Sequence, residues 1–236
     1  MSLFLSRLRF RRDAATAAIR PLFVPDDADE RITAGHRLVW SLFADNPNRR
    51  RDFLWRQDEE HSFMVLSARP PLDTRNIFTV ETKAFVPRLS PGDRLGFVLR
   101  TNATRSAKPA TSDSRGERTD VVMAALAPLA KGDDRREARQ DVADREGRAW
   151  LLRQGAKSGF VADPQELFVR GYRVHRLPRR QRAPGRSAGG VTLGVLDLEG
   201  VLTVAEPAVF LAALASGFGR AKAFGCGLML VRRAPG

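Results

Sequence analysis

Three histidines carry the side chains of this chain that are best suited to acid–base chemistry near neutral pH, because imidazole ordinarily titrates there. His36 lies on a predicted helix, four residues after Ile32 and three before Val39, at the edge of an apolar stripe. That position suits either a partly buried structural histidine or a general acid or base. His61 follows three acids in a predicted turn, and we expect it to be solvated. His175 stands among arginines, where solvation or contact with nucleic acid is expected.

Metal and disulfide chemistry are not expected. The three histidines share no metal-ligand spacing. A single cysteine, Cys226, excludes an intrachain disulfide or a cysteine-based metal cluster, and we expect it to be a small core residue. The sequence therefore predicts neither a metal nor a cofactor.

Positive charge is the main feature of the composition. Forty basic and 27 acidic residues give a net charge of +13, which favours a polyanionic partner over a merely solvated basic surface. One cluster follows a predicted strand and is either a nucleic-acid contact or a polar loop; it contains Arg100, Asn102, Thr104 and Arg105. A second cluster lies on a predicted hairpin and suits the phosphates of a nucleic acid; it contains Arg170, Arg173, Arg176, Arg179, Arg180, Arg182 and Arg186.

A glycine-rich loop, residues 217–227, follows a predicted helix and leads into a strand. Its four glycines and the cations Arg220 and Lys222 fit neither a P-loop nor a dinucleotide-binding motif. Such a loop can bind an anion through its backbone or allow two domains to pack closely, and both interpretations stay open.

The predicted elements give an α+β protein with a break at residues 87–92, and hence two domains at residues 1–88 and 89–236. The expected strands are 3–10, 53–56, 62–67, 77–83, 95–101, 167–176, 191–198, 200–204 and 228–232. The expected helices are 26–43, 121–129, 138–153 and 207–215, and we expect residues 102–118 and 178–190 to be a polar loop and a basic hairpin tip. This order suggests half of a ferredoxin-like unit in the first domain and a β-α-β-β-α-β unit in the second.

No apolar run approaches the roughly 20 residues that a membrane-spanning helix needs. The N-terminus also lacks the apolar region of a signal peptide. We expect a cytoplasmic protein with no membrane partner.

Five segments together resemble the CasE family, the CRISPR RNA-processing endoribonucleases of the type I-E Cascade complex. The similarity covers residues 35–43, 51–55 and 97–105, the Glu-Gly-Val-Leu-Thr motif at 199–203, and the glycine-rich segment 217–228. The last two segments are the most specific. The resemblance implies two tandem ferredoxin-like domains with a cleft between them, metal-independent cleavage of repeat RNA beside its stem-loop, and retention of the product with other Cascade subunits.

The resemblance also assigns roles to residues. The essential histidine of the family falls on His36, and a tyrosine that the family often has one helical turn earlier is replaced by Thr33. Thr33 and Lys157 are possible accessory groups, and Arg220 and Lys222 join the two arginine clusters as candidate RNA contacts. The replacement leaves open a second function, a noncatalytic RNA-binding scaffold. A DNA-binding regulator is a third, but no helix-turn-helix pattern supports it.

Overall fold

Two compact units make up the computed structural model, each with a four-stranded antiparallel sheet. The structure describes residues 3–46, 48–59, 62–107, 117–130, 132–177 and 190–234. The first unit consists of Met1–Arg88, His175–Thr192 and Ala221–Leu228, and the second of Leu89–Val174, Leu193–Arg220 and Met229–Gly236. Both are discontinuous in sequence, so the division into folding domains at 1–88 and 89–236 stays a prediction.

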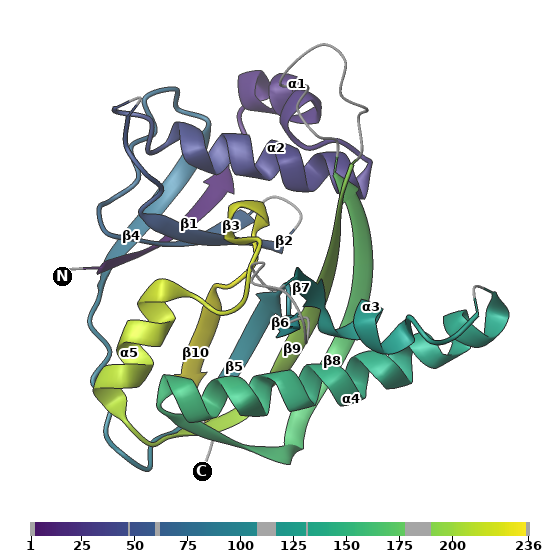
Figure 1. Cartoon of the computed structure of the whole chain (residues 1–236). Coiled ribbons are helices and arrows are strands. Elements are labelled where there is room, and N and C mark those ends of the chain that lie inside the picture. The colour runs from purple at the N-terminus through teal and green to yellow at the C-terminus, as the bar shows by residue number, and fades with distance from the viewer. Residues whose placement is uncertain are drawn as a thin grey trace. The chain divides into compact units, whose positions relative to one another are not determined.

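In the first unit the strand order is β2-β3-β1-β4, as in a ferredoxin-like sheet (Figure 1). The strands are β1 (Leu3–Phe10), β2 (Phe53–Glu59), β3 (Ser62–Ser67) and β4 (Phe78–Phe85). Leu8 of β1 lies opposite Phe63 on one side and Val80 on the other, which fixes the register of the central strands.

Helices α1 (Ala14–Phe23) and α2 (Ala28–Ser41) and the short 3-10 helix η1 (Lys222–Phe224) complete the first unit. Helix α1 is a correction, because the first helix predicted from the sequence begins at residue 26. Asp13 caps α1 by accepting a hydrogen bond from the Thr16 amide at 2.9 Å. Helix α2 buries Leu38 and Val39 in a core with Phe63. Each fully buried side chain of this kind stabilises the fold by about 1.5–3 kcal/mol, so this core fixes α2 on its sheet.

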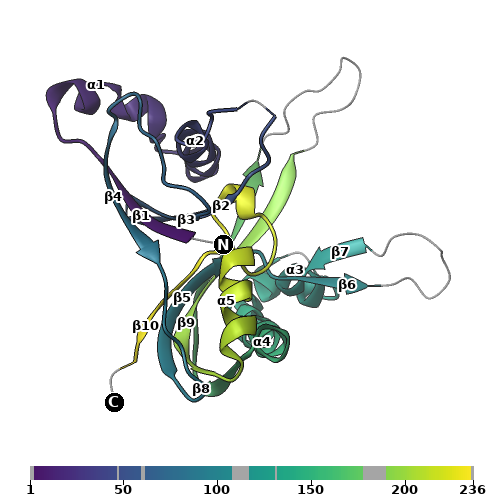
Figure 2. The same ribbon diagram turned by 90° about the vertical axis from the view of Figure 1, so that its left-hand side faces the viewer.

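The second unit follows the β-α-β-β-α-β order, with its sheet in the order β10-β5-β9-β8. Its strands are β5 (Arg94–Thr101), β8 (Phe160–Leu177), β9 (Val191–Val204), β10 (Met229–Arg233) and the hairpin β6 (Thr104–Ala107) and β7 (Glu117–Asp120). Its helices are α3 (Val121–Leu126), α4 (Asp133–Ser158) and α5 (Pro207–Ser216). Helices α4 and α5 lie on one face of the sheet (Figure 2), where Phe210 of α5 packs against Phe160.

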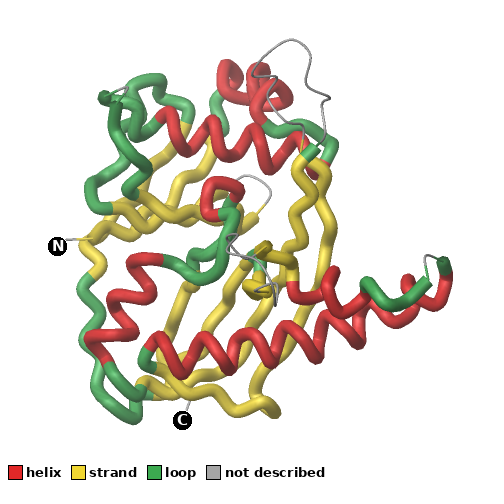
Figure 3. Tube along the Cα trace, in the orientation of Figure 1, coloured by secondary structure: helices red, strands yellow, loops and turns green. Residues whose placement is uncertain are grey.

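The α+β prediction and the ferredoxin-like topology of the units are confirmed, whereas the cleft between domains stays a prediction. Three details differ from the sequence analysis (Figure 3). Residues 104–107 and 117–120 pair as strands, and all of them except 119 and 120 belong to the segment expected to be a loop. Strand β9 is continuous through residues 191–204, and α4 extends well beyond 138–153 at both ends. Within the described part of the chain, no helix has both the length and the apolar character that a membrane span requires.

Candidate active site and RNA-binding residues

His36 lies in the second half of α2, half-buried between two aromatic rings. Its ring centroid is 5.9 Å from that of Trp40, on the same helix, and 6.1 Å from that of Phe224, in η1. Its Nδ1 atom is buried and has no hydrogen-bond partner among the described residues. A buried polar atom without a partner costs free energy, so this nitrogen is a point of low local stability in the structure.

Trp55 of β2 contacts both α2 and the glycine-rich loop. Its indole is 2% exposed, and its Nε1 donates a hydrogen bond to the Ala223 carbonyl at 3.2 Å. A Cβ atom added at Gly35, next to His36, would lie only 2.8 Å from the indole. At Gly225, where φ is +77°, the same atom would lie 3.3 Å from it. The two glycines therefore let α2 and the glycine-rich loop approach the same tryptophan closely.

The surroundings of His36 favour its neutral form. Burial lowers the pKa of His36 below its usual value of 6.5, and the positive charges of Arg51 and Arg37 lower it further, against a backbone hydrogen bond with Ala223 that raises it. Near neutral pH the imidazole is therefore mainly unprotonated. A neutral imidazole can accept a proton, as a general base does.

Two cations share this environment. Burial lowers the pKa of Arg51, and burial together with the charge of Arg51 lowers the pKa of Lys222 in η1. The same Arg51 charge acts on His36, so Arg51 interacts electrostatically with both groups. Such a set suits an anion such as a phosphate, because a negative charge relieves the repulsion between the two cations.

Arg51 was missed by the sequence analysis. It is the last of three consecutive arginines, Arg49 to Arg51, and is separated from the start of β2 by Asp52. Arg49 and Arg50 are exposed, and only Arg51 is half-buried. The run of three was a visible signal, but the sequence did not show which of them turns inward.

The hydroxyl of Thr33, at the position of the family's tyrosine, is bonded within its own helix. Its Oγ1 donates to the Asp29 carbonyl at 3.3 Å, within α2. The one tyrosine of the chain, Tyr172, belongs to the second unit and donates its hydroxyl to Asp120 Oδ1 at 3.0 Å. Burial and the Asp120 charge raise the pKa of Tyr172 far above its usual value.

His175 corrects the sequence analysis, since it is buried rather than solvated. Its Nδ1 lies 2.7 Å from Asp29 Oδ1. The next residue, Arg176, donates its backbone N–H to the other oxygen of Asp29 at 2.9 Å, while its side chain is exposed. These contacts lie within the first unit.

In the second unit, Arg100 and Asn102 have protein partners. Arg100 forms a two-pronged ion pair with Asp197, at 2.8 and 3.2 Å. Asn102 is buried, and its Nδ2 donates to the Gly194 carbonyl at 2.7 Å and to Asp120 at 3.3 Å. This amide stabilises the fold around α3, and RNA contact by Arg100 and Asn102 stays a prediction.

The remaining candidate RNA contacts differ in exposure. Arg170 is exposed but ion-paired with Glu199, and Thr104 is half-buried in β6. The candidates with exposed side chains are Arg105, Arg173 and Arg220 in the second unit and Arg176 in the first. Lys157 is exposed in the last turn of α4. His61, Arg179, Arg180, Arg182 and Arg186 lie outside the described residues.

The first part of the glycine-rich loop is fixed within the second unit. Gly219 has a φ of +73°, and a Cβ atom added there would lie 2.3 Å from Thr101 Oγ1. Beside it, Arg220 donates its backbone N–H to the Asn102 carbonyl at 3.1 Å, and Thr101 donates to the Phe218 carbonyl at 3.1 Å. The loop backbone is thus used for close packing, and RNA contact by Arg220 or Lys222 stays a prediction.

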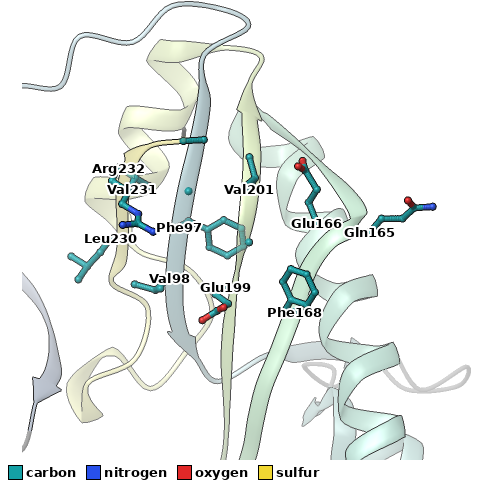
Figure 4. A pocket seen from close by; sticks show the side chains of 13 residues that line it. Phe97, Val98, Gln165, Glu166, Phe168, Glu199, Val201, Leu230, Val231 and Arg232 are labelled. Atoms are coloured by element: carbon teal, nitrogen blue, oxygen red, sulfur yellow. The ribbon is translucent and has the colours of Figure 1, made fainter. Parts of the chain in front are cut away.

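A separate pocket of about 530 Å³ lies on the second unit, over strands β10, β5, β9 and β8 (Figure 4). Its floor is apolar, with Val98, Val201 and Phe168. Its two acids are ion-paired, Glu166 with Arg94 and Glu199 with Arg170. Both carboxylates are therefore held by guanidinium groups of the same unit.

Known proteins match this chain over nearly its whole length. Residues 3–233 match the family model described as CRISPR associated protein. The chain belongs to this family. The CRISPR system Cascade subunit CasE of Escherichia coli K12 is 26% identical over 201 residues, which is 82% of this chain and 88% of the relative.

Solved structures show that this CRISPR-associated protein shares the fold of its relatives. Thermus thermophilus Cse3, bound to an RNA that represents a pre-cleavage complex, superposes with a TM-score of 0.65 at 23% identity over 100% of both chains. Cas6e from Escherichia coli K-12 gives a TM-score of 0.55 at 23% identity, over 98% of this chain and 100% of that one. At this level of identity, the structures establish the architecture alone.

Proposed function

We propose that this protein is the endoribonuclease that cuts the repeat RNA of CRISPR transcripts at the base of its stem-loop. The observation that carries the proposal is the half-buried His36, which lies between Trp40 and Phe224 and has its pKa lowered by burial and by the charge of Arg51. The same Arg51 charge acts on Lys222. Family membership and the CasE relative support the RNA substrate.

The chemistry follows from these three groups. Neutral His36 takes the proton of a ribose 2′-hydroxyl, and the 2′-oxygen attacks the neighbouring phosphorus. The bond from phosphorus to the 5′-oxygen breaks, and Lys222 gives that oxygen a proton. Arg51 stabilises the negative charge that develops on the phosphorane. The products are a 2′,3′-cyclic phosphate, or the 3′-phosphate after its hydrolysis, and a 5′-hydroxyl.

The donor set supports a reaction without a metal ion. The charges that act on the His36 ring are those of two guanidinium groups, Arg51 and Arg37, and Arg51 also acts on the ammonium group of Lys222. A divalent cation prefers carboxylate or carbonyl oxygens and would be repelled by Arg51 and Lys222. The nucleophile is instead the RNA's own hydroxyl, and the charge stabilisation comes from side chains.

Binding of the stem-loop is assigned to the exposed arginines. Arg105, Arg173, Arg176 and Arg220 present guanidinium groups on the surface, and such groups suit the phosphates of an A-form helix. Because the curated relative is a Cascade subunit, we propose that the protein keeps the processed RNA and assembles with other Cascade subunits.

A noncatalytic scaffold is the second candidate, and the observation that favours it is Thr33. The position where the family often has a tyrosine carries a hydroxyl that is bonded to the Asp29 carbonyl. If proton transfer requires a phenol at that position, the protein binds RNA without cutting it.

The deciding experiment is cleavage of a labelled repeat hairpin in EDTA by the wild type and by His36→Ala. We expect the wild type to cut at the stem base, and the variant to be about 10²–10⁴-fold slower with unchanged binding. A hairpin with a 2′-deoxy nucleotide at the cut site is the matched control and should bind without being cut. Tight binding with no cleavage by either protein would establish the scaffold.

A further inference from the structure

Asp29 uses both oxygens of its carboxylate on a segment that is distant in sequence. It lies in the first turn of α2, but the capping of this helix is done by Asp27, which accepts from the amides of Asp29 and Glu30. Asp29 Oδ1 instead pairs with His175, 146 residues away, and Oδ2 accepts from the Arg176 amide, 147 residues away. A first-turn acid that is not needed for capping is therefore bound to the end of β8.

Burial and charge both stabilise the contact of Asp29 with His175 and Arg176. His175 is buried, and the Asp29 side chain is 31% exposed. The backbone hydrogen bond from Arg176 and the pairing with His175 hold the pKa of Asp29 below its usual value, so the carboxylate is ionised at neutral pH. Charge-assisted hydrogen bonds of this kind are stronger than neutral ones.

Asp29 and His36 lie on the same side of α2. They are seven residues apart, which is close to two helical turns, or about 10 Å along the axis. Arg176, whose amide is bonded to Asp29, has an exposed side chain. The carboxylate thus fixes the point from which this guanidinium extends, relative to the helix that carries His36.

We propose that Asp29 is a positioning residue for RNA cleavage: it holds Arg176 at a set place relative to α2, so that a phosphate bound by Arg176 places the scissile phosphate at His36. The proposal rests on the proposed function of the His36 site. It concerns alignment rather than chemistry, because Asp29 touches neither His36 nor the reacting atoms. A misplacement of about 1 Å can cost about 10²-fold in rate, so alignment is worth an additional residue.

The test is a double-mutant cycle with Asp29→Ala, Arg176→Ala and the double variant, measured as single-turnover cleavage at saturating enzyme. We expect Asp29→Ala to be about 10-fold slower or more, and the same change to have little further effect in the Arg176→Ala background. Glu30→Ala removes the same charge from an exposed neighbour on the same helix and should cleave like the wild type. Additive losses, or a wild-type rate for Asp29→Ala, would overturn the proposal.

Hydrogen exchange at residues 175–177, without RNA, tests the contact independently of activity. Asp29→Ala should lose protection at the Arg176 amide, whereas Glu30→Ala should keep it. Unchanged protection in Asp29→Ala would refute the contact itself. If the wild type and Glu30→Ala fail to cleave, the proposed function fails, and the exchange result still decides whether Asp29 holds the strand.

Discussion

At the scale of single residues, the coupling of His36 to Arg51 has a direct effect on the proposed chemistry. A base must be unprotonated to act, and the lowered pKa of His36 provides that form at neutral pH. Burial alone would also weaken phosphate binding, but Arg51, whose charge acts on both His36 and Lys222, keeps positive charge in this environment. The site therefore combines a neutral base with cationic groups for the phosphate.

The pH dependence of cleavage should report this coupling. At limiting enzyme, where the rate reflects the free protein, activity should rise with pH and level off above a pKa lower than 6.5. Replacing Arg51 with Gln removes one cause of the lowering, so the acidic limb should move to higher pH. Rate–pH profiles of the wild type and Arg51→Gln make the comparison.

Arg50→Gln is the matched control, because it removes the same charge from an exposed neighbour. Its profile should overlay that of the wild type. An activity that falls with rising pH through this range would mean that His36 donates a proton rather than accepting one, and would contradict its assignment as the base.

The sequence identified His36 only through the family resemblance, because a histidine at the edge of an apolar stripe is compatible with a structural role. Arg51, Trp55 and Asp29 were not identified as parts of the site. Each acts through a partner far away in sequence, such as Ala223 for Trp55 and His175 for Asp29. Residue type and spacing indicate local faces of helices and strands, but not these long-range partners.

At the scale of elements, the glycine-rich loop is fixed at several points along its length. Its first part is bonded to the end of β5 in the second unit, and its later part packs on Trp55 in the first. Lys222 lies between these anchors, in η1. The backbone that carries Lys222 can make these close contacts because glycines stand at positions 219 and 225.

Replacing Gly219 with Ala should show this requirement. The new methyl group would collide with Thr101 and Asn102, and the backbone φ of +73° is unfavourable for alanine. We expect a loss of about 1–3 kcal/mol in the free energy of unfolding, measured by denaturant titration.

Gly171→Ala is the control for Gly219→Ala, since nothing lies within 4 Å of a Cβ atom added at Gly171 in the same unit. It should change stability by less than about 0.5 kcal/mol. Equal stability of the two variants would show that the loop tolerates a shift at Gly219.

Most elements were predicted from periodicity, and the misses have physical causes. Helix α1 is short and contains Pro21, so its pattern was weak. Strands β6 and β7 have polar sequences that resemble a loop, and they are defined by pairing with each other. Pairing partners of short polar strands are set by tertiary structure, which the local sequence does not encode.

At the scale of the whole molecule, the net charge of +13 predicts strongly salt-dependent RNA binding. A protein that makes about six phosphate contacts loses about 10³-fold in affinity between 50 and 200 mM salt. Replacing Arg173 with Ala should reduce the slope of log affinity against log salt by about 0.7–0.9, the contribution of one phosphate contact. Binding titrations at several salt concentrations measure it.

Arg136→Ala provides the comparison for this slope. Arg136 is also in the second unit, but it is highly exposed on α4 and paired with Asp133. Its removal lowers the net charge equally and should leave the slope unchanged. Equal slopes for Arg173→Ala and Arg136→Ala would assign the effect to overall charge instead of a contact.

The single cysteine gives the protein a built-in reporter. Cys226 is fully buried in the glycine-rich loop, between Gly225 and Gly227. A thiol reagent can reach it only when this part of the structure opens, so the labelling rate measures the free energy of that opening. RNA that engages Lys222 would slow the labelling. A second cysteine placed on an exposed helix could then carry a fluorophore selectively, because the native thiol reacts far more slowly.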